Sequence, residues 1–373
     1  MQINPFKLEQ YFQKYEFTAP YLLCCSDAES YSVKDIIAMA TPVDNHIWNE
    51  LRLGYTESRG RPELRETLAT TLYNFDYENI LCFAGAEEGI FCTLYALCEP
   101  EDHVIVLTPC YQSLKEIPRL KNTEVTEIQL LEVNNWRIDL EAIKTAIRPN
   151  TKCVIINFPH NPTGQIITSD ELQNLVTLLD KHGIWLFSDE AYRLLGNPSE
   201  GWSLPAAVVY DKAISLGVMS KAYGLAGLRV GWIACKDKEI LKKIEQVKHY
   251  TTICNSAPSE VISLIALKNQ ESILHRNNMI VRKNMELLDT FLNRNRELFS
   301  WVRPHGGCVG FINYNSNESV EMLSSRAVEK AGVLLLPASI YETNSNHFRI
   351  GYGRSNMPEA LSKFEEFLAN ENL

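Results

Sequence analysis

The sequence lacks the features that mark membrane, secreted and disulfide-bonded proteins. No apolar run in its 373 residues is long enough to cross a bilayer. The N-terminus has no positively charged segment followed by an apolar core, so we recognise no secretory signal. Ten cysteines are scattered without a Cys-x-x-Cys pair, which favours reduced thiols, and we assign no metal ligands. We therefore expect a cytoplasmic protein with no membrane partner.

An excess of positive charge is also missing. Lys and Arg number 36 against 46 Asp and Glu, and the net charge of −10 argues against nucleic acid as a partner. No Gly-x-Gly-x-x-Gly opens a helix after an early strand, which argues against a nicotinamide-dependent dehydrogenase. There is no repeat, low-complexity segment or long linker. The length allows two or three domains, or one large domain with a smaller one.

From about Arg61 onward, apolar β-rich runs alternate with helical segments. A helix is expected to start at Pro62, and another over 169–182 with Ser169 as its cap. The alternation predicts an α/β fold with a mainly parallel sheet covered on both faces. Ligands bind beyond the carboxyl ends of the strands in such sheets. The β-rich runs are 103–107, 153–158, 184–189, 213–219 and 230–235.

The pattern changes beyond about residue 254. One long helical stretch covers 259–294, short strand-like runs follow at 310–313 and 348–351, and a final helix begins near Pro358. At the other end, a helix over 8–15 gives way to an irregular stretch over 24–30. We predict a large α/β domain over 45–260. A smaller α+β domain is formed by 1–44, the N-terminal segment, and 261–373.

The stretch 220–232 places Lys221 and Arg229 eight positions apart across a glycine-rich turn. Buried strands precede the lysine and follow the arginine, which argues against an ordinary surface lysine. Burying an ammonium without a partner is costly. A lysine in this position therefore indicates an amine that is neutral or covalently bound, as in a Schiff base.

Five other motifs accompany this stretch: Gly54-Tyr55 with Gly60 and Leu64-Arg65, Gly85-Ala86-Glu87-Glu88, Asn157 to Gly164, Ser188 to Tyr192, and Phe348 to Gly351. In this order the six elements, which cover about residues 54 to 351, closely resemble those of the class I/II aminotransferases. These fold-type-I enzymes use pyridoxal 5′-phosphate (PLP). The resemblance implies a seven-stranded-type sheet. It also implies transfer of an amino group between an amino acid and a 2-oxo acid.

The resemblance further implies the residues that handle the reacting end of the cofactor. Lys221 would form the Schiff base and move the α-proton, and Asp189 would pair with the pyridine nitrogen. Asn161 and Tyr192 would donate hydrogen bonds to the phenolic oxygen. Lys221, Asp189 and Tyr192 form the predicted catalytic set.

The remaining roles implied by the resemblance concern the phosphate, the ring face and the substrate. Arg229, Ser220 and the backbone amides of Gly85, Ala86 and Glu87 would hold the phosphate. Tyr111 would stack on the ring. Arg349, with Asn161, would bind the substrate α-carboxylate. Tyr55 would reach the phosphate of a neighbouring subunit, which implies a homodimer.

Other interpretations of single residues remain open at this point. Asp189 could cap a strand end, and Tyr192 and Tyr111 could be packing residues. Arg349 could form a surface ion pair, with Arg354 as its rival for the carboxylate. Val218 stands where the family usually carries a phosphate-binding hydroxyl, three positions before the lysine.

Other reactions also remain open. The same cofactor chemistry supports elimination, replacement or cyclisation. The sequence Gly-Val-Met-Ser-Lys at residues 217–221 and residues 27–30 resemble a capreomycidine-synthase-like branch, which acts on a modified amino acid. A non-enzymatic PLP-binding module is a further alternative, but the chain has no room or basic patch for a DNA-binding domain.

Overall fold

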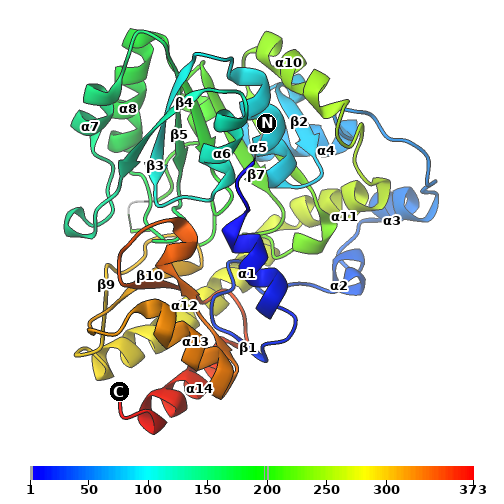
Figure 1. Ribbon diagram of the computed structural model, residues 1–373. Coiled ribbons are helices and arrows are strands. Elements are labelled where there is room, and N and C mark those ends of the chain that lie inside the picture. The colour runs from blue at the N-terminus through cyan, green and yellow to red at the C-terminus, as the bar shows by residue number, and fades with distance from the viewer. Residues whose placement is uncertain (1–2, 197, 200) are drawn as a thin grey trace.

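The larger part of the molecule is built on a seven-stranded sheet (Figure 1). The computed structural model describes residues 3–196, 198–199 and 201–373, so residues 1 and 2 of the predicted small domain lie outside it. The strand order is β2-β8-β7-β6-β5-β3-β4, and only β8 runs against its neighbours. The predicted mainly parallel sheet is confirmed. Its strands are β2 (Ile80–Phe83), β3 (His103–Thr108), β4 (Glu124–Gln129), β5 (Thr151–Asn157), β6 (Trp185–Asp189), β7 (Ala213–Val218) and β8 (Gly231–Cys235).

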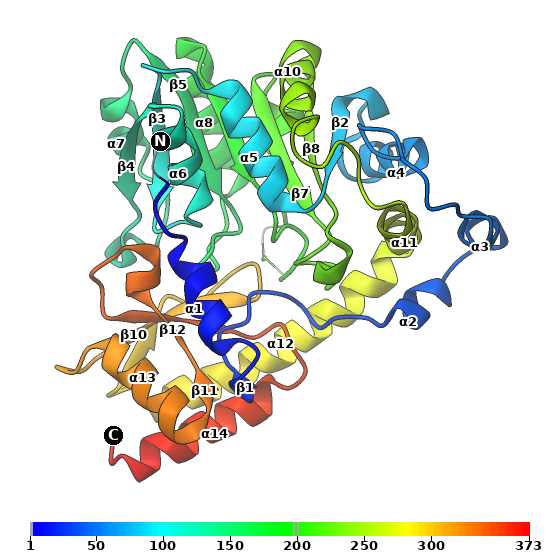
Figure 2. The ribbon, with the colours of Figure 1, turned by 45° about the vertical axis from the view of Figure 1, so that its right-hand side comes forward.

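Helices cover both faces of this sheet because successive strand residues point to opposite sides. Val104 and Val106 of β3 pack in one cluster with α5, α6 and α10, whereas Ile105 and Leu107 pack in another with α7, α8 and α9. Figure 2 shows α5 and α10 on the near face of the sheet. The bounds of these helices are α5 (Ala86–Leu97), α6 (Ser113–Leu120), α7 (Leu140–Ala146), α8 (Ser169–His182), α9 (Ala206–Val209) and α10 (Lys238–Lys248).

A second group of elements lies below the large sheet in Figure 1. It contains a four-stranded antiparallel sheet of order β12-β13-β10-β9 and a parallel pair of β1 with β11. The strands are β1 (Tyr21–Leu22), β9 (Phe299–Trp301), β10 (Val309–Tyr314), β11 (Val333–Leu334), β12 (Leu336–Pro337) and β13 (His347–Gly351). All seven strands of the large sheet fall within 45–260 and these six fall outside it, an arrangement compatible with the predicted domains.

The remaining helices connect and cover these sheets. Those before the large sheet are α1 (Lys7–Tyr15), α2 (Val33–Ile37), α3 (Pro42–Asn49) and α4 (Pro62–Leu68); those after it are α11 (Ala257–Lys268), α12 (Gln270–Arg294), α13 (Val320–Ala331) and α14 (Met357–Asn370). In both ribbon views α1 lies between the large sheet and the smaller group of elements. Within the described ranges, no helix combines the length and the apolar character needed to cross a membrane.

Two local predictions are wrong. The single helix over 259–294 is broken at Asn269, where the backbone leaves the helical region. The Asn269 side chain donates to the carbonyl of Ile265, so it occupies an acceptor at the end of α11. The cap of α8 is Thr168 and not Ser169: the Thr168 hydroxyl accepts from the Glu171 amide, and the Glu171 carboxylate accepts from the Thr168 amide.

Candidate active site

A cavity of about 380 Å³ opens where the large sheet faces α1 and the smaller sheet. The parallel neighbours β5, β6 and β7 end at it with Asn157, Asp189 and Val218. Carboxyl ends of parallel strands lie at one edge of a sheet, so residues far apart in sequence meet there. Of the predicted site residues, the cavity lining includes Ala86, Glu87, Tyr111, Asn161, Asp189, Tyr192, Ser220, Lys221, Arg229 and Arg349.

Lys221 lies just beyond the end of β7 and faces this cavity. Its Nζ donates to Ser26 Oγ at 2.9 Å and lies 5.5 Å from the centroid of the Tyr192 ring. Burial lowers the pKa of Lys221, because the charged ammonium loses its hydration. The following turn needs Gly224, which has φ +69°; a Cβ there would approach the carbonyl oxygen of Glu29 to 2.3 Å.

Asp189 and Tyr192 are buried beside the lysine and have few partners. The only hydrogen bond that the described chain gives the Asp189 carboxylate comes from the Ala191 amide, at 3.0 Å. Burial raises the pKa of Asp189 to about 7, which the Ala191 hydrogen bond and the Lys221 charge partly oppose. The buried Tyr192 hydroxyl makes no hydrogen bond of ordinary geometry within the described ranges, although Ser26 lies nearby. Both groups are therefore available to a ligand.

Asn161 and Arg349 join the large sheet to the smaller one. Asn161 Oδ1 accepts from Arg349 Nη1 at 3.2 Å and from the Tyr341 hydroxyl at 2.8 Å. Because the oxygen of the amide is occupied, its NH₂ group remains to donate elsewhere. Asn161, predicted to bind the cofactor, is thus hydrogen-bonded directly to Arg349, predicted to bind the substrate.

Arg349 and Arg354 differ in what already occupies them. Arg349 is fully buried on β13 and donates to the Cys24 carbonyl, but no carboxylate of the described residues lies within ion-pair distance of it. Arg354 is held by both oxygens of Asp27, at 3.0 and 2.9 Å. A buried guanidinium without a counter-ion is a ready partner for a ligand carboxylate. This geometry favours Arg349 over its rival.

The start of α5 and the turn after Lys221 form the opposite end of the cavity. Gly85, the N-cap of α5, has φ +93°, and a Cβ there would meet Arg229 Nη2 at 2.4 Å. Gly231 allows β8 to approach the same turn closely, since a Cβ added at this position would lie only 2.8 Å from the Ala86 nitrogen. Arg229 Nη1 donates to the Ala226 carbonyl at 3.2 Å, and Ser220 Oγ lies 3.5 Å away. The guanidinium and the helix amides therefore face one site suited to an anion.

Two further side chains affect this end of the cavity. Val218 lines it, so no hydroxyl comes from that position. Ser215 is no substitute, because its hydroxyl is bonded to Glu190 Oε1 at 2.7 Å. The Glu87 side chain also lines the cavity, accepts from Ser113 Oγ, and has a pKa raised by burial. The sequence predicts a role in the phosphate site only for the backbone amide of Glu87, and not for its carboxylate.

Tyr111 and Tyr55 have very different surroundings. Tyr111 lines the cavity, and its ring centroid lies 5.1 Å from that of Phe6. Its hydroxyl contacts Glu9 Oε1 at 3.4 Å. Tyr55 lies outside the cavity with 92% of its surface exposed. One chain therefore does not bring Tyr55 to the other predicted site residues.

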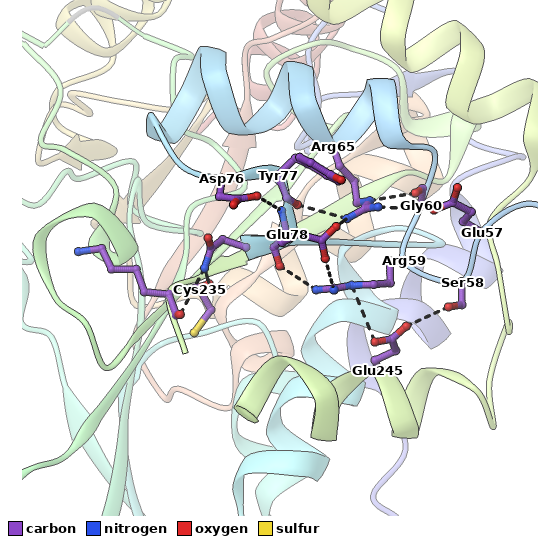
Figure 3. Close-up of polar contacts among 12 residues, drawn as sticks. Glu57, Ser58, Arg59, Gly60, Arg65, Asp76, Tyr77, Glu78, Cys235 and Glu245 are labelled. Atoms are coloured by element: carbon purple, nitrogen blue, oxygen red, sulfur yellow. Dashed lines mark hydrogen bonds and ion pairs between the residues drawn. The ribbon is translucent and has the colours of Figure 1, made fainter. Parts of the chain in front are cut away.

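The segment that follows Tyr55 is firmly anchored (Figure 3). Arg65 donates to the Gly60 carbonyl at 3.0 Å and contacts Glu78, whereas Arg59 pairs with Glu78 at 2.7 Å. A second carboxylate, Glu245 of α10, lies 3.8 Å from Arg59. Tyr55 is thus an exposed side chain held next to a fixed turn.

Sequence reasoning missed several residues of the cavity. Ser26 contacts Lys221, Asp27 occupies Arg354, and Tyr341 holds both Arg349 and Asn161. The sequence predicts an irregular stretch over 24–30, in which residues 27–30 resemble a capreomycidine-synthase-like branch, but it gives no role to Ser26, Asp27 or Tyr341. The face of α1 that lines the cavity, with Leu8, Glu9 and Phe12, and the C-cap residue Glu16 were also missed.

This sheet, with a lysine beyond β7, an aspartate at the end of β6 and an anion site at the start of α5, defines the PLP-dependent enzymes of fold type I. The family described as "Aminotransferase class I and II" matches residues 30–364, and the chain belongs to this family. The predicted family, fold, enzyme class and cofactor are confirmed.

Individual relatives agree with this assignment. An aspartate/prephenate aminotransferase of Thermus thermophilus is 28% identical over 330 residues, 84% of this chain and 83% of the relative. A capreomycidine synthase of Streptomyces vinaceus is 24% identical over 364 residues, 97% and 93% of the two chains. The crystal structure of a PLP-dependent aminotransferase from Streptococcus suis superimposes with a TM-score of 0.93 at 29% identity, covering 99% of both chains.

The residues present fit PLP. The unsatisfied Tyr192 hydroxyl matches a ring oxygen, and the isolated Asp189 carboxylate matches a protonated ring nitrogen. The space between Gly85 and Arg229, which a Cβ at residue 85 would fill, is suited to a phosphate group. Lys221 faces the same cavity as all three groups.

Proposed function

We propose that this aminotransferase uses Lys221, Asp189, Tyr192, Asn161 and Arg349 as its reacting and binding groups. The observation that carries the proposal is their convergence: one cavity collects these five side chains from the ends of three neighbouring strands and from β13. The substrates are an amino acid and a 2-oxo acid. PLP, when bound, supplies the carbonyl group that accepts the amine and the ring that accepts electrons.

Each residue has a defined task in this proposal. Asp189 holds the proton on the ring nitrogen, where its buried carboxylate gains the counter-charge that it otherwise lacks. Tyr192 and Asn161 donate to the ring oxygen. Lys221 Nζ accepts the proton from the substrate α-carbon, since a lysine with a lowered pKa is available as a base.

Binding and orientation fall to the other residues. Arg229, Ser220 and the amides of Ala86 and Glu87 hold the phosphate, and Tyr111 covers one face of the ring. Arg349 binds the α-carboxylate with its planar fork. Because Asn161 bonds to Arg349, the substrate carboxylate and the ring oxygen are oriented by one connected pair.

We further propose a homodimer in which Tyr55 completes the phosphate site of the partner subunit. The exposure of Tyr55 supports it, as do Leu53, Tyr250 and Ile253, which expose 84%, 92% and 52% of their surfaces. Where such side chains gather into one patch, they mark an interaction surface. A cytoplasmic location stays an expectation; it is supported by ten cysteines that are all free thiols.

Reduction with borohydride tests the assignment of Lys221. We expect peptide mass mapping of the reduced holoenzyme to find the pyridoxyl group on Lys221. A label on another lysine would contradict the assignment.

A screen of single half-reactions tests the reaction itself. The holoenzyme is mixed with one amino acid at a time while the absorbance of the bound cofactor is followed. Transamination gives a 2-oxo acid and the amino form of the cofactor in equal amounts. Ammonia or a cyclised product without that form would instead identify a lyase or cyclase, the alternative that the capreomycidine synthase relative represents.

A further inference from the structure

The face of α1 that lines the cavity lies over the site proposed for the substrate carboxylate. Phe12 is central to this face, and the Arg349 guanidinium lies 5.9 Å from its ring centroid. Glu9 lies three residues before Phe12, and Glu16, the C-cap residue whose backbone continues the helical conformation of α1, lies four residues after it; all three side chains line the cavity. Residues at this spacing share one side of a helix.

Contacts with both parts of the molecule fix the orientation of α1. The backbone amide of Lys7 donates to Gln112 Oε1 at 3.0 Å, on the side of the large sheet. The Tyr11 hydroxyl donates to the Leu335 carbonyl at 2.7 Å, and the Lys7 ammonium pairs with Glu342 at 3.0 Å, on the other side. The carboxylates of this face are therefore presented to the cavity by an anchored helix.

Most charged groups of the cavity have either a partner within the chain or an assigned place on the ligand. In the proposed function Arg229 faces the phosphate, Asp189 the ring nitrogen, and Arg349 the substrate α-carboxylate. Arg354 is occupied by Asp27. The Glu87 carboxylate belongs to the phosphate end, where it is bonded to Ser113.

Glu9 and Glu16 are the carboxylates that remain without an ion pair in the described part of the chain. Glu9 is exposed at the mouth of the cavity, and Glu16 is half-buried and attracted by Arg354, which Asp27 already occupies. Among the described residues, neither forms an ion pair: the only hydrogen bond to Glu9 comes from Tyr111, at 3.4 Å. The two lysines of α1 point elsewhere, Lys7 to Glu342 and Lys14 over the ring of Tyr15.

We infer that the face of α1 carrying Glu9 and Glu16 selects amino acid substrates whose side chain ends in a positive charge. The inference rests on the proposed function, because Arg349 must hold the α-carboxylate for the side chain to extend toward α1. Two unpaired carboxylates attract an ammonium or guanidinium and repel a side-chain carboxylate, so the same face disfavours aspartate and glutamate.

Matched amino acids provide the test. Ornithine and norvaline share one carbon skeleton and differ by the terminal amine, and lysine and norleucine form a second such pair. We expect the wild-type holoenzyme to show a kcat/KM for each cationic member roughly tenfold or more above that of its neutral partner, and aspartate to be the poorest substrate.

Variants assign the preference to α1. In Glu9→Gln, Glu16→Gln or the double variant, the ratio of ornithine to norvaline should fall about five- to tenfold, mainly through the KM of ornithine. Measurable norvaline turnover shows that a variant is folded. Glu321→Gln, at an exposed carboxylate on α13, is the matched control and should leave the ratio unchanged.

Equilibrium binding gives a readout independent of turnover. 5-Guanidinopentanoate carries a carboxylate and a distal cation but no α-amine, so calorimetry should show it binding the holoenzyme more tightly than heptanoate. This difference should shrink in the double variant.

The outcomes separate the inference from the proposed function. A wild-type preference for norvaline or aspartate, or an unchanged ratio in the double variant, would overturn the inference while leaving transamination in place. Failure of every amino acid to yield a 2-oxo acid would instead defeat the proposed function.

Discussion

At the scale of single residues, Asp189 shows how the cavity depends on its cofactor. Its carboxylate is buried with one amide donor, and burial raises its pKa to about 7. In the cofactor-free protein, burial of this charged carboxylate destabilises the folded state. In the holoenzyme the same carboxylate gains a cationic partner, so the sign of its contribution changes with the state of the site.

The first prediction follows from this cost. Below the ordinary pKa of 3.8 the carboxyl is protonated whether folded or unfolded, and the cost is absent; it grows as the pH rises toward about 7. In cofactor-free protein, Asp189→Asn should therefore raise the free energy of unfolding by a few kcal/mol at pH 8 and by less at pH 5. Thermal unfolding at both pH values measures it, with exposed Asp211→Asn as control. Equal shifts at the two pH values would contradict it.

The same substitution should have the opposite effect on the holoenzyme. An amide cannot hold the proton on the ring nitrogen, so turnover should fall roughly a hundredfold or more while the fold is retained. Steady-state kinetics of Asp189→Asn with bound PLP is the measurement. Turnover near that of the wild type would show that Asp189 does not serve the ring.

A third prediction compares the two arginines near the substrate. Arg349→Lys keeps the charge but loses the planar fork, so KM should rise roughly 10- to 100-fold for every amino acid substrate alike. The PLP spectrum should not change. Arg354→Lys is the matched variant, since Arg354 is occupied by Asp27, and its effect should be much smaller. The reverse pattern would mean that Arg354 binds the carboxylate.

At the scale of elements, α8 separates local sequence preference from the structure that forms. Thr168 and Ser169 are both good caps, and only the geometry shows which one acts. Thr168→Ala should cost about 1 kcal/mol of unfolding free energy, because it removes the acceptor for the Glu171 amide. Ser169→Ala should cost far less. Chemical denaturation of the two variants decides between them.

The break between α11 and α12 is the corresponding case for a helix end. Helical periodicity continues through Asn269, so the sequence predicts one element. The side chain of Asn269 bonds to Ile265 in α11 and to the Met39 carbonyl from the N-terminal region, and the latter contact has no local signal. Tertiary contacts thus determine where one helix ends and the next begins.

At the scale of the whole molecule, the position of Tyr55 leads to the fifth prediction. Tyr55 is exposed on one chain but is assigned to a phosphate site, so two chains are needed. Mixing Lys221→Ala and Tyr55→Phe protomers should give hybrid dimers with one fully native site, and hence activity above that of either parent. The Tyr55→Phe parent must itself be strongly impaired for this comparison. A monomer by light scattering would contradict the proposal.

Much of the site could be predicted because each of its motifs is a short contiguous segment of the sequence. Lys221 and Asn161 each follow a buried apolar strand and Asp189 ends one, and parallel strands bring their carboxyl ends to one edge. Strand patterns and short motifs were therefore enough to predict the α/β fold, the family and ten of the residues that line the cavity. Their chemical roles are what the experiments above test.

Only the tertiary structure decided which partners these residues have. Arg354 forms an ion pair with Asp27, 327 positions away, and Arg349 donates a hydrogen bond to the backbone carbonyl of Cys24, 325 positions away. Glu9 and Glu16 line the cavity because α1 is anchored to both parts of the molecule. The physical reason is that motifs and periodicity report local geometry, whereas charge pairing across a cavity depends on how distant segments pack.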